Sequence, residues 1–106
     1  GMLERTMVVV TSEFGRTSKV KGNGGRDHHP NGFSCMLAGG GIKGGQAVGE
    51  TNEKGREPDP KFEPKDFHAT IATAMGMNVE KRFHPKGGGR PSFVGGRGKP
   101  IMELLV

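Results

Sequence analysis

The densest group of side chains able to do chemistry is the run Arg26-Asp27-His28-His29, where a carboxylate is followed by two imidazoles. Carboxylate oxygens and imidazole nitrogens bind divalent cations of the zinc, manganese, magnesium or calcium type. Glu13, which follows the first apolar run, would add a second carboxylate if the two segments meet. Glu13, Asp27 and His28 are therefore candidate metal ligands. The alternative interpretation of the same run is a polar loop without a ligand.

Two arginines in the same part of the chain are candidates for holding an anion. Arg16 and Arg26 stand close to the predicted ligands in sequence, and a guanidinium group binds oxyanions through paired hydrogen bonds. The alternative for both is an ordinary surface arginine. The glycine run 39–45 does not match a phosphate-binding loop, because the Gly-Lys-Ser/Thr ending is missing and no helix is predicted after it. Ser12 has no neighbouring base, so no residue is predicted to be catalytic.

Few elements are available to position these side chains. The segment 5–12 is the clearest strand, and its apolar centre (7–10) is typical of a strand buried on both faces, as in a parallel sheet. A second strand is predicted over 33–38, and a short edge strand over 46–48. The predicted ligands lie in loops directly after a strand, which is where open α/β sheets bind their ligands.

One helix is predicted, over residues 64–75. Pro64 suits the first helical position, and Asp66 falls in the first turn, where the helix dipole favours an anion. Apolar side chains recur every four residues, at Phe67, Ile71 and Met75. Residues 101–105 are expected to form a final helical turn. The remainder, including 49–62 and 78–100, is predicted to be loop.

Composition and patterning leave one small, loop-rich domain with a thin core, few strands and one main helix, or a piece of something larger. The chain has 106 residues, of which 20 are glycine and seven are proline, and hydrophobic residues make up 31%. We expect a single domain over 2–106, with Gly1 left from an expression tag. The lone Cys35 excludes a disulfide scaffold, and no apolar run is long enough to span a membrane. No signal peptide is recognised, and the compartment stays open.

The charge balance is basic, with 16 Lys and Arg against 11 Asp and Glu and a net charge of +5. The basic residues are mostly single, without a block of five or six, and only six Phe are available for base stacking. Nucleic acid is therefore an unlikely partner on this pattern. The charge could also suit an anionic surface or an anionic small substrate, but the pattern favours an ordinary solvated surface with a basic bias.

Three ordered motifs resemble those of a large bacterial family of unknown function that is often described as sulfatase-like. The first is Thr11-Ser12-Glu13-Phe14-Gly15-Arg16-Thr17, the second begins at Gly25-Arg26-Asp27-His28 and continues through the glycine run 39–45, and the third is Asp66-Phe67-His68-Ala69-Thr70-Ile71. The resemblance covers essentially residues 4–106. By resemblance, that family belongs to the alkaline phosphatase and sulfatase superfamily.

That resemblance implies part of a doubly wound α/β sheet and hydrolysis of phosphate or sulfate esters at a metal centre. Glu13-Phe14 stands where the superfamily has a metal-binding Asp-His pair, and His28 stands where it has a later ligand. Phe14 cannot bind a metal, so one ligand is absent. The chain resembles only the C-terminal portion of such proteins, and the nucleophile lies in the other portion.

Two functions are therefore expected. The first is the C-terminal part of a metal-dependent phosphatase- or sulfatase-like hydrolase, inactive alone. The alternative is a non-enzymatic, truncated module that works through a homo-oligomer or a partner chain, since an uncovered strand exposes apolar surface and a free edge.

Overall fold

The apolar run near the start of the chain forms strand β1 (Met7–Val10), as the sequence predicts. In the computed structural model, which describes residues 1–106, β1 pairs with β4 (Met36–Gly39) in register Met7 to Gly39. This pair is antiparallel, and Val8, Val9 and Val10 are all exposed. The expected burial on both faces, as in a parallel sheet, is therefore absent from this chain.

The remaining strands are two residues long and form three further antiparallel pairs. β2 (Gly15–Arg16) pairs with β3 (His28–His29), β5 (Glu50–Thr51) with β6 (Pro58–Asp59), and β7 (Arg82–Phe83) with β8 (Ser92–Phe93). The predicted edge strand over 46–48 does not form, and the neighbouring β5–β6 pair lies within a segment predicted to be loop. The fold is thus mixed α/β, with several separate two-stranded ladders.

Helix α1 (Pro64–Ala74) confirms the predicted helix almost to the residue. Pro64 begins it and Asp66 lies in its first turn. Three short segments complete the secondary structure: the 3-10 helix η1 (Leu3–Arg5), the turn η2 (Val94–Arg97), in which Gly95 and Gly96 have positive φ, and the 3-10 helix η3 (Met102–Leu104). The last of these confirms the helical turn expected near the C-terminus.

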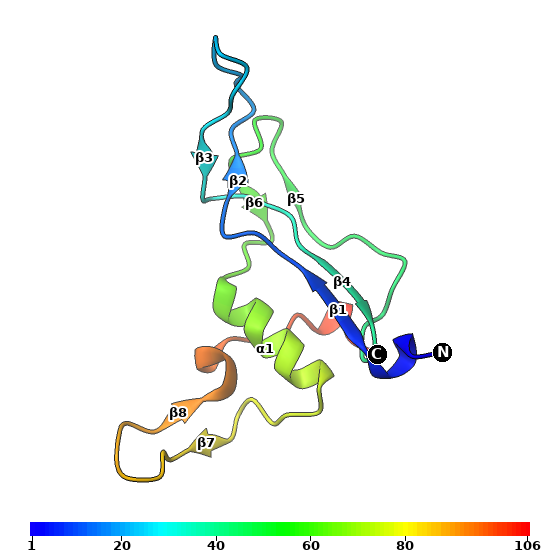
Figure 1. Cartoon of the computed structure of the whole chain (residues 1–106), viewed down its shortest axis with the longest axis vertical. Helices are drawn as coiled ribbons and strands as arrows, with labels where there is room; N and C mark the ends of the chain where they lie inside the picture. The colour runs from blue at the N-terminus through cyan, green and yellow to red at the C-terminus, as the bar shows by residue number, and fades with distance from the viewer.

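The small core lies where the C-terminal segment crosses α1 (Figure 1). The buried apolar residues are Ile42, Ala69, Ala72 and Ile101. Gly95 and Gly98 let the backbone of the crossing segment lie directly on the helix, since a Cβ at Gly95 would come 2.8 Å from the backbone nitrogen of Ala69 and one at Gly98 would overlap the carbonyl oxygen of Lys65. Backbone contact therefore replaces side-chain packing here.

The molecule is extended, and most of its surface is open to solvent. Only six of 106 residues are buried, and the radius of gyration is 16.6 Å, against about 13 Å for a globular chain of this length. The accessible surface of 8250 Å² exceeds the value of about 5,700 Å² expected for a folded protein of 11.3 kDa. The β2–β3 and β7–β8 hairpins lie at opposite ends of the molecule (Figure 1). None of the helices has the length and apolar character that crossing a bilayer requires.

Candidate functional site: the β2–β3 hairpin

The β2–β3 hairpin brings the first two sequence motifs together. Gly15 pairs with His29 and Arg16 with His28, so the segment after β1 lies beside the Asp27-His28 pair. A Cβ on Gly15 would overlap the carbonyl oxygen of Gly32, which explains why this strand position needs glycine. The predicted meeting of the two segments is therefore present in the backbone.

An aromatic stack fixes the base of this hairpin. The rings of Phe14 and His28 lie with their centroids 3.8 Å apart and their planes 20° from parallel. The guanidinium carbon of Arg16 lies 5.3 Å from the centroid of the Phe14 ring, within the range of a cation–π contact. The Phe14 ring, which cannot bind a metal, thus contacts both the imidazole of His28 and the guanidinium group of Arg16.

Backbone carbonyl oxygens hold both arginines of the predicted anion site. Arg16 Nη1 donates to the carbonyl oxygen of Arg26 at 3.1 Å. Arg26 Nη1 donates to the carbonyl oxygens of Thr17 and Ser18, each at 3.0 Å. A guanidinium carries five N–H donors, so each arginine keeps donors on its remaining nitrogens. The two side chains are therefore positioned and still able to bind an oxyanion.

The three predicted metal ligands do not form a metal site within this chain. The Asp27 carboxylate forms an ion pair with Lys21, and the His28 ring is stacked on Phe14. No ion pair joins Glu13 to His28. No group of three or more His, Cys, Asp or Glu side chains lies close enough to hold an ion. These three side chains are therefore not gathered as one set of ligands in this chain, and metal binding by them stays a prediction.

His29 is a functional position that the sequence analysis did not select. It is buried, and its Nε2–H donates to the carbonyl oxygen of Gly55 at 2.8 Å. This bond joins the β2–β3 hairpin to the turn between β5 and β6. His29 therefore links the hairpin to that turn, while the ring of its neighbour His28 stacks on Phe14. Nothing in the local sequence distinguishes the two histidines, because the partner of His29 is 26 residues away.

The polar residues of the third motif hold the C-terminal segment on α1. Asp66 accepts the backbone N–H of Glu63 at 2.9 Å and that of Lys99 at 2.8 Å. These two hydrogen bonds, from Glu63 first and Lys99 second, lower the pKa of the Asp66 carboxyl below its ordinary value. Thr70 accepts the backbone N–H of Ile101. Asp66 and Thr70 of the third motif therefore fasten the C-terminal segment to the helix, and we call this pair the α1 clasp. It lies far from Arg16 and Arg26.

Comparison with known proteins identifies the family. Searches of curated proteins and of solved structures found no match. A family model described as "Protein of unknown function (DUF1501)" matches residues 1–105, which include the hairpin motifs and the α1 clasp. The chain therefore belongs to this family of proteins of unknown function.

Proposed function

We propose that this chain supplies one part of a protein that acts like the metal-dependent phosphate and sulfate ester hydrolases it resembles, and that it is inactive without the rest of the site. The observation that carries the proposal is the hairpin itself. The motifs at 11–17 and 25–28 meet there. Backbone carbonyl oxygens accept hydrogen bonds from Arg16 and Arg26, and each guanidinium group keeps further N–H donors for an anion. In this proposal the two guanidinium groups bind the anionic ester group.

The incomplete ligand set supports inactivity of the isolated chain. Glu13, Asp27 and His28 would bind a divalent ion only with further ligands from another segment or chain, and only if Asp27 leaves Lys21. We assign no chemical step to such an ion. In the same proposal, the exposed faces of the β1–β4 ladder would be covered within a larger, doubly wound sheet of the alkaline phosphatase type.

The test is binding of inorganic phosphate and inorganic sulfate to the 106-residue chain, followed by NMR shifts of arginine side chains. We expect weak binding that Arg16→Ala and Arg26→Ala each reduce several-fold, while Arg56→Ala, on the neighbouring turn, leaves it unchanged. Aryl phosphate and aryl sulfate should not be hydrolysed, with or without added zinc, manganese, magnesium or calcium. Anion binding that survives both hairpin variants would contradict the proposed site, and turnover by the chain would contradict its inactivity.

The second candidate function is a non-enzymatic module that works through a second copy or a partner chain. It is favoured by the excess accessible surface, about 2,500 Å² above that expected for the mass, which exceeds the area of roughly 800 Å² that each partner buries in a standard interface. Light scattering on the purified chain, alone and with added partner peptides, separates self-association from binding to a partner chain.

A further inference from the structure

The net charge of the protein is concentrated in one segment. Residues 76–100 contain six basic residues and one acidic residue, Glu80, and so carry a net charge of +5. Basic and acidic residues balance in the rest of the chain, since the whole chain also has a net charge of +5. The six basic residues are Lys81, Arg82, Lys86, Arg90, Arg97 and Lys99. We call residues 76–100 the basic arm.

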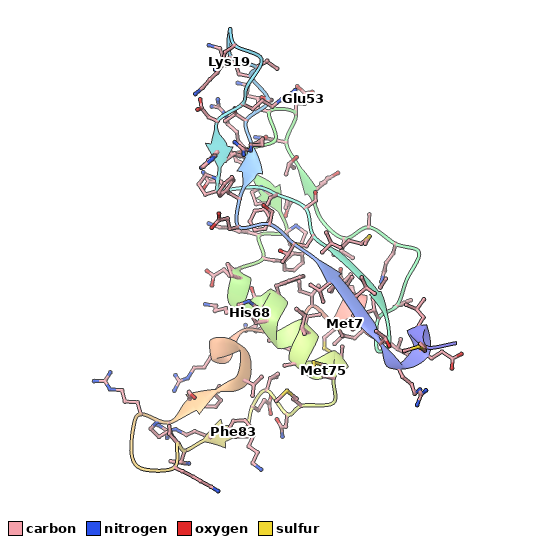
Figure 2. The ribbon with its side chains drawn as sticks, in the orientation of Figure 1. Met7, Lys19, Glu53, His68, Met75 and Phe83 are labelled. Carbon is pink, nitrogen blue, oxygen red and sulfur yellow. The ribbon has the colours of Figure 1, made fainter.

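The cations of the basic arm have no anionic partners within the molecule. The ion pairs of the structure involve Lys21 and Lys65, which lie outside the arm. Nitrogen-tipped side chains project outward around the β7–β8 hairpin, near the labelled Phe83 (Figure 2). Because like charges that face water without counter-charges repel one another, the arm favours an acidic partner.

An apolar groove adjoins this arm along the length of α1. The helix contributes Ile71, Ala72 and Met75, and the arm contributes Met77, Val94 and Gly95. Lys65 and His68 also line the groove, which has a volume of about 510 Å³. From Lys65 to Met75 the helix advances about 15 Å at 1.5 Å per residue. The groove is therefore long enough to receive two to three turns of another helix.

We infer that this groove and the basic arm together dock an acidic amphipathic helix of a separate protein. Apolar residues spaced i, i+3, i+4 and i+7 on that helix would lie against Ile71 and Val94. The flexible thioethers of Met75 and Met77 adapt to different apolar side chains. Glutamates or aspartates flanking the apolar stripe would face the unpaired cations of the arm. The inference names the partner required by the second candidate function and does not depend on the hydrolase proposal.

Two other occupants fit the surface less well. Nucleic acid would need free aromatic faces, but Lys81 Nζ lies 5.8 Å from the Phe83 ring centroid and the Arg97 guanidinium carbon 4.8 Å from that of Phe93. A second copy of the chain would bring its own +5 arm to the same groove, and the two arms would repel. The apolar lining favours a protein segment, and the charge specifies an acidic one.

The experiment uses a fluorescent designed peptide of about 18 residues with leucines at helical spacing and glutamates on both flanks. One control peptide carries lysine in place of each glutamate, and a second keeps the composition but scrambles the leucine spacing. Fluorescence anisotropy with the full 106-residue chain should give at least about tenfold tighter binding for the glutamate peptide than for either control. Raising the salt concentration should weaken that binding.

Two variants test the two halves of the surface. Met75→Asp places a charge in the groove at a side chain that is 68% exposed, so the fold should tolerate it. The double variant Arg82→Glu/Arg90→Glu reverses charge on the arm. Each should weaken binding of the glutamate peptide at least about fivefold. Lys19→Glu, at the opposite end of the molecule (Figure 2), should change it less than about twofold, with circular dichroism as the check on folding.

Besides a result on oligomeric state, four binding outcomes would overturn the inference. These are no binding of the glutamate peptide, equal binding of the lysine or scrambled peptide, unchanged binding in both surface variants, and tighter binding of a single-stranded oligonucleotide than of the glutamate peptide. A dimer detected by light scattering that Met75→Asp dissociates would instead assign the groove to a second copy. Loss of anion binding in Arg16→Ala bears only on the hydrolase proposal, because that hairpin lies at the other end of the molecule (Figure 1).

Discussion

The hydroxyl oxygen of Thr70 accepts the backbone N–H of Ile101 at 2.8 Å, across 31 residues of sequence. Thr70 is completely buried, and its hydroxyl also donates to the carbonyl oxygen of Asp66 at 2.7 Å. One side chain thus joins α1 to the C-terminal segment. In a molecule with so few buried apolar residues, such polar links account for much of the order around the helix.

Replacing Thr70 with valine tests this link. Valine has nearly the same shape but leaves the N–H of Ile101 buried without an acceptor, so Thr70→Val should destabilise α1 and the C-terminal segment by about 1–3 kcal/mol. The measurement is the free energy of local opening from amide hydrogen exchange in α1. Thr73→Val is the matched control, because the Thr73 hydroxyl bonds only to Ala69 one turn away, and it should cost less than about 0.5 kcal/mol. Equal effects of the two variants would argue against the link.

Substitution of Gly98 tests the backbone contact beside that link. Gly98 has an ordinary φ of −65°, so the residue is required by space and not by backbone conformation. Gly98→Ala should cost at least about 2 kcal/mol, since its Cβ would overlap the carbonyl oxygen of Lys65. Thermal unfolding followed by circular dichroism measures it. Gly22→Ala has open space around its Cβ and should change stability little, and a comparable loss there would contradict the steric explanation.

The pH dependence of stability should carry a contribution from Asp66. Its pKa is lowered by the N–H groups of Glu63 and Lys99, so the folded state prefers the carboxylate. That stabilisation is fully present above the ordinary Asp pKa of about 3.9 and is lost as pH falls from there through the lower folded-state pKa. As pH falls below about 4, urea unfolding should therefore show a steeper loss for the native chain than for Asp66→Asn.

The matched control for this pH dependence is Glu53→Gln, at an exposed glutamate in the turn between β5 and β6. It should lose stability over the same pH range as steeply as the native chain. If Asp66→Asn keeps the native slope as well, the bonds from Glu63 and Lys99 do not set the pKa of that carboxyl.

His29 should be needed to hold the β2–β3 hairpin in place. His29→Leu leaves the carbonyl oxygen of Gly55 without its donor and should cost about 1–3 kcal/mol. His29→Gln can place an amide N–H in the same position and should cost less. The readout is the rate of limited trypsin cleavage at Lys54 and Arg56, which should rise most in the leucine variant. Equal cleavage in both variants would mean that the bond does not hold this turn.

Local sequence signals predicted the elements that depend on local chemistry. Pro64 and Asp66 mark the start of α1, and the valines mark β1, because capping and apolar patterning act over a few residues. The two-residue ladders were not predicted, since four residues in two segments leave no periodic pattern to detect. The exposure of Val8–Val10 was also missed, because a pattern reports what a strand could bury and not whether a neighbour is present to cover it.

The candidate site, like the fold, was predictable from the sequence only in part. The ladder of β2 and β3 places Gly15 and Arg16 beside His28 and His29, while the convergence of the Glu13 and His28 side chains stays a prediction. Side-chain partners were beyond sequence reasoning. The Lys21–Asp27 ion pair and the Phe14–His28 stack depend on rotamers and on hairpin twist. The selection of His28 over the buried His29 depends on a carbonyl group 26 residues away.

Four ladders that share no strand have a consequence for calorimetry. A continuous sheet melts as one cooperative unit, because each strand supports the next. Here the ladders share no strand, so one hairpin can open without unpairing the next ladder, while hydrogen bonds from Asp66 and Thr70 tie α1 to residues 95–101. Heating should therefore give a broad endotherm whose van't Hoff enthalpy is smaller than the calorimetric one, with the two hairpin arms melting first.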